Sequence, residues 1–192
     1  MNEKMKKALH RTLKPGETAL WESATQPFSI TDGREGKRTL IEWILSALCI
    51  GAIVVFFTAN GGGSARFFII MALLLALFIG SPILSYRQLR GQYYLITQTR
   101  AIMLRTDGSA YVMELEEMGE CRLYPLDFGG AAIALGSVLL EEKDKQLRWR
   151  ANHPQESANA NGVNGVRGLV FYHVERAEEA MRILSGYAAK EG

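Results

Sequence analysis

The sequence has only two cysteines in 192 residues, Cys49 and Cys121. Cys49 lies in an apolar run and Cys121 in a polar flank, so a disulfide framework of the kind found in small secreted domains is excluded. Neither cysteine belongs to a CxxC pair, and His10, His153 and His173 are far apart in the chain. No ligand set for a metal ion can be recognised, and we expect no cofactor.

A strong excess of one charge is also missing. Lysine and arginine total 22, aspartate and glutamate total 20, and the formal net charge is +2. Nucleic-acid-binding domains usually carry a much larger basic excess, so we expect no nucleic-acid partner. The first 30 residues contain no long apolar core, which argues against a cleaved secretory signal.

Catalytic motifs are lacking as well. No lysine or helix start follows Gly129, Gly130 and Gly136 in the way that a P-loop or a GxGxxG motif requires. Cys121 has no base close in sequence, which favours a neutral thiol over a nucleophile. Four glutamates between residues 114 and 120 could pair for acid–base catalysis, but a solvated strand end is the favoured interpretation. We therefore expect neither an enzyme nor a small-molecule substrate.

Two long apolar runs dominate what the sequence does contain. The first spans residues 40–58 with Glu42 as its only charge, and the second spans residues 67–86 without any charge. At about 1.5 Å per residue, each helix would be about 30 Å long, the thickness of a hydrocarbon core. We predict a transmembrane helical hairpin over residues 39–86, with a glycine-rich turn at its tip; the alternative is a helical hairpin buried in a soluble core. Glu42 lies in the first turn, where a structural role at the interface is favoured over proton transfer.

Small residues recur at a spacing of four in both runs. They are Ala47 and Gly51 in the first run, and Ala72, Ala76 and Gly80 in the second. Small side chains let transmembrane helices approach closely and gain dispersion contacts. We predict that these residues pack the helices together or contact a partner.

Basic residues near the ends of the runs predict the orientation. Arg34, Lys37 and Arg38 precede the first run, Arg87, Arg90, Arg100 and Arg105 follow the second, and the turn carries Arg66 alone. Because lysine and arginine accumulate on the cytoplasmic side, we expect both termini in the cytoplasm and the glycine-rich turn on the far side of the membrane. Trp43 and Tyr86 fit an aromatic belt at the inner boundary, and we expect them to contact the membrane surface together with Arg87 and Arg90.

The first fourteen residues predict a basic amphipathic helix, which Pro15-Gly16 ends. Methionine and leucine recur at a spacing of four, and the other sides carry Lys4, Lys6, Lys7, Arg11 and Lys14. Such a helix can lie on an anionic leaflet; a solvated tail is the alternative. Residues 15–38 would then form a strand, centred on Leu20 and Trp21, and a polar linker.

Residues 87–192 predict an α+β domain rather than further spans. Seven strands are expected at 92–97, 100–106, 109–118, 121–126, 132–142, 146–151 and 169–174, with a hairpin turn at Asp107-Gly108. Residues 153–168 are expected to form a long mobile loop, and residues 175–190 an amphipathic helix. The fold class is thus an α+β membrane protein with a seven-stranded antiparallel barrel or sandwich, which the terminal helix caps.

The segments "LKPGETALWE" (13–22) and "YYLITQTRAIML" (93–104), on either side of the hairpin, carry a family resemblance. The chain resembles bacterial pleckstrin-homology-like membrane proteins, and Tyr94, Leu95, Thr97 and Arg100 match the hairpin that opens their β domain. The resemblance implies a seven-stranded, helix-capped fold. It also implies that the membrane is a bacterial inner (plasma) membrane, which the chain would cross with two spans. Most members of the family have no known catalytic residues, and none is transferred here.

Three functions are considered. The first is a non-catalytic, membrane-anchored interaction module, an accessory or assembly subunit of a larger inner-membrane complex, with membrane lipids, a membrane protein complex or a second copy as partners. The second is a binder of anionic lipid head groups, which requires basic side chains to converge from Arg100, Arg105, Arg122, Arg148 and Arg150. The third is a membrane-associated hydrolase, for which the sequence offers no more than glutamates and histidines.

Overall fold

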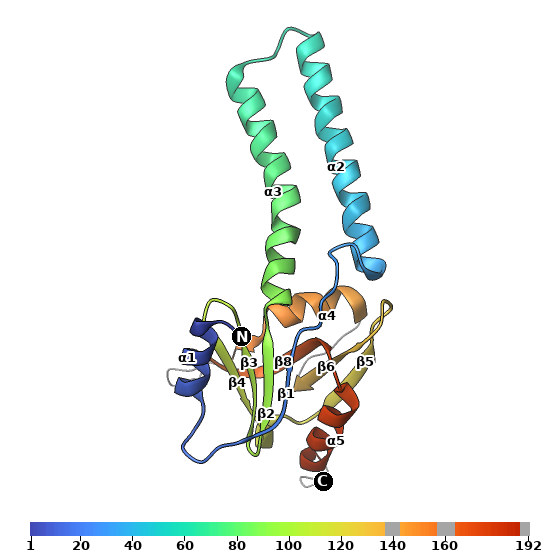
Figure 1. Cartoon of the computed structure of the whole chain (residues 1–192). Coiled ribbons are helices and arrows are strands. Elements are labelled where there is room, and N and C mark those ends of the chain that lie inside the picture. The colour runs from blue at the N-terminus through green and yellow to red at the C-terminus, as the bar shows by residue number, and fades with distance from the viewer. Residues whose placement is uncertain (137–142, 157–163, 189–192) are drawn as a thin grey trace. The chain divides into compact units, whose positions relative to one another are not determined.

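The chain divides into two units in a computed structural model, which describes residues 1–136, 143–156 and 164–188 (Figure 1). One unit comprises Met1–Phe28 and Gln88–Gly192, and the other comprises Ser29–Arg87. The first 28 residues therefore fold with the segment that follows the apolar runs, although about sixty residues separate them in the sequence.

The second unit is a helical hairpin made of α2 (Gly33–Ala59) and α3 (Ala65–Arg90). Both helices are long and apolar enough to cross a membrane, and the most apolar window of each is not buried within the chain. Gly61, at φ +77°, provides the left-handed backbone that reverses the chain at the tip. These observations confirm the two predicted helices and argue against a soluble core around them.

Helix α2 begins at Gly33, earlier than the apolar run predicts. Part of the expected polar linker is therefore helical. An ion pair between Arg38 Nε and Glu42 Oε1, at 3.0 Å and four residues apart, joins this polar start to the apolar run. The pair gives Glu42 a cationic neighbour within its own helix, and a structural role for Glu42 at the membrane interface stays a prediction.

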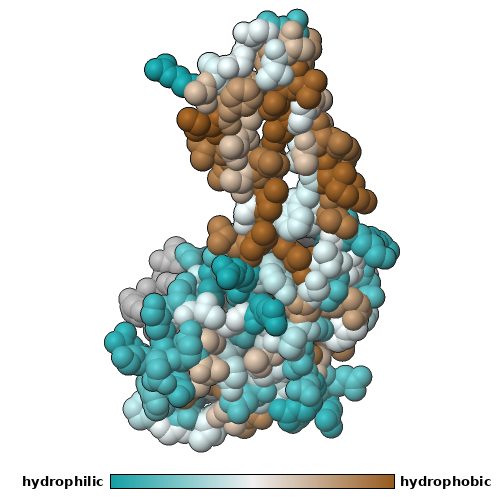
Figure 2. All heavy atoms as spheres, turned by 45° about the horizontal axis from the view of Figure 1, so that its top comes forward, coloured by the Kyte–Doolittle hydropathy of each residue, from teal (hydrophilic) through white to brown (hydrophobic). Residues whose placement is uncertain are grey.

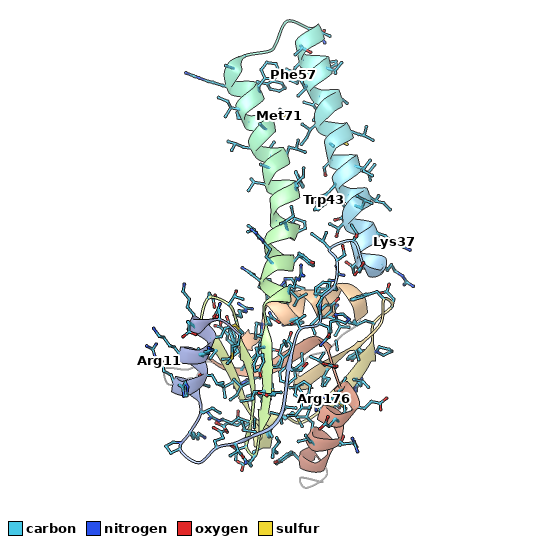
Figure 3. All side chains as sticks on the ribbon, viewed as in Figure 1. Arg11, Lys37, Trp43, Phe57, Met71 and Arg176 are labelled. Atoms are coloured by element: carbon cyan, nitrogen blue, oxygen red, sulfur yellow. The ribbon has the colours of Figure 1, made fainter. Side chains whose placement is uncertain are left out.

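The half-buried positions in the apolar runs of α2 and α3 carry mostly bulky side chains, with Ser46, Gly80 and Ser85 as the small ones among them. Half-buried residues on the facing sides of the two helices include Trp43, Ser46, Ile50 and Val54 of α2, and Phe67, Met71, Leu75 and Ile79 of α3. Near the tip Phe57 stacks on Phe67 with ring centroids 4.8 Å apart, and Figure 3 shows Trp43, Phe57 and Met71 along the hairpin. Figure 2 shows apolar side chains gathered along the hairpin, whose outer surface is exposed.

The other unit is built on a mixed, curled half-barrel sheet. Its strands are β1 (Ala19–Ala24), β2 (Tyr93–Thr97), β3 (Arg100–Leu104), β4 (Ala110–Glu114), β5 (Cys121–Pro125), β6 (Ala131–Gly136), β7 (Gln155–Glu156) and β8 (Asn164–Val174). Their order is β1-β2-β3-β4-β8-β6-β5, and β7 pairs with β8. An isolated bridge between Thr25 and Val174 joins the segment after β1 to the end of β8.

Two features of the predicted sheet are wrong. The described residues form eight strands rather than seven, and β4 pairs with β8 in parallel, so the sheet is not wholly antiparallel. The parallel pair depends on the path of the chain between β6 and β8, which no local signal encodes. The predicted turn at Asp107-Gly108 is confirmed, because β3 and β4 pair across it, and β2 and β3 pair across the residues between them.

Several predicted segments also differ. The expected strand at 146–151 is part of helix α4 (Lys143–Asn152). The expected strand at 109–118 ends at Glu114, where a single 3-10 turn, η1 (Leu115–Glu117), follows. The expected loop at 153–168 contains β7 and the start of β8, and its residues 157–163 lie outside the described part of the chain. Residues 137–142 of another expected strand also lie outside it.

The main core lies between the sheet and helix α5 (Ala177–Ala188). Trp21, Tyr94 and Phe171 form its aromatic centre, and Tyr94 and Phe171 stack with centroids 4.7 Å apart. Ala180 and Leu184 of α5 are fully buried against this core. The two residues that the predicted helix had beyond α5, Ala189 and Lys190, lie outside the described residues.

A second, smaller core lies under α1 (Glu3–Thr12). Met5 and Ala8 are buried there against Leu95, Ile102 and Leu104 of the sheet. Both faces of β2 and β3 are thus covered, which explains why these strands read as continuous apolar runs. The apolar face of α1 packs on protein, so α1 is not the solvated tail that was the alternative. Contact of its basic side with an anionic leaflet stays a prediction.

Candidate functional site

The two segments that carry the family resemblance meet in the fold. Glu17, from the Pro-Gly-Glu segment, accepts hydrogen bonds from Arg100 Nε at 2.9 Å and from Thr97 Oγ1 at 2.6 Å. A second bond joins the other oxygen of Glu17 to an Arg100 nitrogen, and Arg100 also donates to the Thr12 carbonyl at the end of α1 at 2.8 Å. One ion pair therefore ties α1, the entry to β1 and the β2–β3 turn together.

The environment of this ion pair keeps it charged. The side chains of Glu17 and Arg100 are each 5% exposed. Burial raises the pKa of the Glu17 carboxyl, but the hydrogen bonds from Arg100 and Thr97 outweigh it and lower the pKa to about 2. Glu17 is ionised, and Arg100 donates hydrogen bonds to Glu17 and to the Thr12 carbonyl. The pair therefore fits a structural role and not that of an acid–base catalyst.

A buried polar network surrounds the hydroxyl of Tyr94. This oxygen donates to Gln92 Oε1 at 2.7 Å and accepts from the Tyr172 amide at 3.1 Å. Gln92 in turn donates to the Ala151 carbonyl at 2.8 Å, and Thr25 Oγ1 lies 3.1 Å from the Tyr94 oxygen. Burial raises the pKa of Tyr94, so a neutral phenol links β1, β2, β8 and the end of α4.

An aromatic cluster holds the last residues before the hairpin unit. The Phe28 ring lies 5.6 Å from Tyr172 and 5.7 Å from His173, and the Arg148 guanidinium lies 5.6 Å from its centre. Phe128 completes the cluster, 5.0 Å from His173. His173 has φ +50°, and its Nδ1 lies 3.1 Å from the Gln26 carbonyl. The cluster fixes the exit of the chain from the β unit.

The structure places the predicted helix-packing residues away from the facing sides of the hairpin. Ala47, Gly51, Ala72 and Ala76 are exposed, and a Cβ added at Gly51 or Gly80 would meet no atom within 4 Å. These residues therefore do not pack α2 against α3. They remain candidates for contact with another polypeptide.

The predicted membrane-surface residues are mostly exposed. Lys4, Lys6, Lys7, Arg11 and Lys14 keep their charges away from the small core under α1, since only its apolar side is buried. Lys14 Nζ also lies 3.3 Å from Glu114. At the hairpin boundary Arg87 and Arg90 are exposed, while Trp43 and Tyr86 are half-buried.

The arginines required for a head-group pocket are largely committed elsewhere. Arg100 is clasped by Glu17. Arg105 donates to the Asn152 carbonyl and, at 3.0 Å, to the Tyr111 hydroxyl. Arg122 pairs with Glu120 at 2.7 Å on β5, and Arg148 Nε donates to the Tyr172 hydroxyl at 2.9 Å. The structure does not support a pocket made of these side chains.

No group of three or more histidine, cysteine or acidic residues able to hold a metal ion occurs in the described part of the chain. His10, His153 and His173 lie on α1, after α4 and on β8, respectively. Burial raises the pKa of the Cys121 thiol, against a hydrogen bond with Ser185, so the thiol is neutral near pH 7.

Comparison with models of protein families, with curated proteins and with solved structures found no match to this chain. Function therefore has to be argued from the molecule itself. The sequence did not predict helix α4 and favoured a strand there. Leu147 and Ala151 share one face at a spacing of four, and this was the available signal.

Proposed function

We propose that this protein is a non-catalytic, membrane-anchored interaction module of a bacterial inner membrane. The hairpin of α2 and α3 spans the bilayer, both termini lie in the cytoplasm, and the β unit is a pleckstrin-homology-like domain that binds or positions a partner at the membrane. In its sharper form, the protein is an accessory or assembly subunit of a larger membrane complex.

One observation carries the proposal: the apolar windows of two helices, 27 and 26 residues long, are not buried within the chain. In water this surface would be strongly unfavourable, at about 25 cal/mol for each Å² of apolar area. Lipid removes that cost, and the β unit has two cores of its own that do not need the hairpin. The protein therefore consists of an anchor and a separately folded unit.

The excess of basic residues at the open end of the hairpin supports the orientation. Arg34, Lys37 and Arg38 lie in the first turns of α2, Arg87 and Arg90 lie in the last turn of α3, and the tip carries Arg66. This distribution follows the positive-inside rule, which places the β unit in the cytoplasm.

The rows of small residues, exposed except for the half-buried Gly80, support a partner within the membrane. Ala72, Ala76 and Gly80 lie on one side of α3 at a spacing of four, and Ala47 and Gly51 form the corresponding row on α2. The bulky facing sides of the hairpin do not use these rows, so the helix of another subunit, or of a second copy, can approach the backbone there.

Gentle extraction from native membranes, followed by cross-linking and mass spectrometry, tests the proposal. We expect a stoichiometric companion with the wild-type chain and its loss with Ala76→Phe, because the added ring blocks the close approach of a helix. Leu77→Phe is the matched control, since Leu77 is the exposed neighbour of Ala76 on a different side of the helix. Recovery of the wild-type chain as a lone monomer would contradict the proposal.

A further inference from the structure

Helix α4 presents an aromatic and basic surface on the side opposite its buried face. Leu147 and Ala151 are 1% and 0% exposed, whereas Trp149 is 52% exposed. The guanidinium of Arg150 lies over the Trp149 ring, 4.8 Å from its centre. The His153 ring lies one helical turn after Trp149 and stacks on the Trp149 ring, with ring centroids 5.0 Å apart. This outer surface of α4 thus combines a large exposed indole with a cation.

The end of α4 is fixed beside the residue at which the chain leaves the hairpin. Gln92 comes two residues after Arg90, the last residue of α3, and it is 1% exposed. Its side-chain amide donates to the Ala151 carbonyl at 2.8 Å. Arg105 also donates to the adjacent Asn152 carbonyl. The outer surface of α4 therefore belongs to the part of the β unit that is closest along the chain to the second span.

The charge of α4 complements an anionic leaflet. Arg150 lies over Trp149 on the outer surface of α4, whereas Arg148 of the same helix donates to the Tyr172 hydroxyl and belongs to the aromatic cluster. Arg87 and Arg90, in the last turn of α3, add two further exposed positive charges close to the same point of the chain. Each basic side chain near an anionic surface gains about 1 kcal/mol of attraction, so several together favour a membrane over a neutral protein surface.

We propose that the outer surface of α4, made of Trp149, Arg150 and His153, docks on the head-group region of the anionic cytoplasmic leaflet. Tryptophan prefers this region because its ring has a large apolar area and a polar N–H. Arg150 contacts lipid phosphate while it remains over the ring, and α4 acts as a membrane contact in addition to the hairpin. This inference rests on the proposed anchoring by the hairpin and adds the orientation of the β unit.

Tryptophan fluorescence of the full-length chain in lipid nanodiscs tests the docking. The discs contain either anionic or zwitterionic lipid, with a nitroxide quencher on a fraction of the head groups. Trp21 is 3% exposed inside the β unit and stays in place as an unquenched reference. Trp43→Phe leaves Trp149 as the reporter of docking, and Trp149→Phe leaves Trp43 as the reporter of hairpin insertion.

In anionic discs we expect the quencher to remove the Trp149 share of the emission from the Trp43→Phe variant, and to remove much less in zwitterionic discs. Quenching of Trp43 without quenching of Trp149 would overturn the docking and leave the anchoring intact. Absence of quenching in both variants would overturn the anchoring itself. Equal quenching of Trp149 in both kinds of disc would overturn the requirement for an anionic leaflet.

Charge reversal in the Trp43→Phe background, which keeps Trp149 as the reporter, provides a second measurement. Arg150→Glu changes the charge by two units, so the ratio of docked to undocked molecules should fall about 25-fold, at about fivefold per charge. Arg182→Glu makes the same change at an exposed position of α5 and should leave the quenching of Trp149 unchanged. Equal effects of both variants would contradict a contact specific to α4.

Discussion

At the scale of single residues, the most informative contact is the ion pair between Glu17 and Arg100. These residues are 83 positions apart and each side chain is 5% exposed. Removing one partner of a buried pair leaves an uncompensated charge in a poor solvent, which costs far more than the loss of a surface pair. Each of the two segments that carry the family resemblance supplies one partner of this pair, and each partner needs the other to be buried as a charged group.

Glu17→Gln should destabilise the β unit by about 3–5 kcal/mol, because Arg100 then stays buried without its anion. Denaturant unfolding of the detergent-solubilised chain, followed by near-ultraviolet circular dichroism of the aromatic core, measures the change. Glu114→Gln is the control: it removes a pair with Lys14 in which both side chains are largely exposed, and it should cost at most about 1 kcal/mol. Similar losses in both variants would contradict the role of the buried pair.

The same carboxyl predicts a dependence of stability on acid. The pKa of Glu17 is lowered from 4.5 to about 2 in the fold. Between these pH values the unfolded chain binds the proton of Glu17 more readily than the folded chain does. The contribution of Glu17 to the free energy of unfolding is therefore complete above the unfolded pKa and is lost as pH falls toward the folded pKa. We expect wild-type stability to fall in this window more steeply than that of Glu17→Gln. Parallel pH profiles would show that Glu17 is not the group responsible.

At the scale of elements, periodicity alone identified where α1 would form but not what its apolar face would contact. A stripe of methionine and leucine suits a leaflet and a sheet equally well. The choice was made by β2, β3 and β4, whose outer faces carry Leu95, Ile102, Leu104 and Val112 and need a cover. For α4, periodicity did not identify the type of element. The short apolar spacing in "QLRWRA" fits a strand or a helix, and the packing of Leu147 and Ala151 selected the helix.

Met5→Ala tests whether α1 belongs to the β unit. Met5 is 3% exposed against the sheet, so removing most of its side chain should lower the free energy of unfolding by about 2–5 kcal/mol. Lys7→Ala, at an exposed position of the same helix, should change it by no more than about 0.5 kcal/mol. Unchanged stability of Met5→Ala together with weaker membrane binding would instead favour a helix inserted in the leaflet.

At the scale of the whole molecule, the proposed topology places the helix tip and the β unit on opposite sides of the membrane. Ser64, at the tip, and Arg182, on α5, are both exposed in their own units. The two variants are made in a chain whose native cysteines have been replaced. In intact cells, a membrane-impermeant maleimide should label Ser64→Cys and spare Arg182→Cys. Both should be labelled after the membrane is opened. Labelling of Arg182→Cys in intact cells would reverse the orientation.

The sequence by itself determined the hairpin, because the length and apolarity of a span are local properties that need no partner from elsewhere in the chain. It also determined the β2–β3–β4 meander, whose strands are neighbours joined by short turns. Only the tertiary structure decided the parallel pairing of β4 with β8, the burial of α1 and the clasp between Glu17 and Arg100. These features join segments that are far apart in the sequence. Each of them stabilises the fold only when the folded chain buries both partners together.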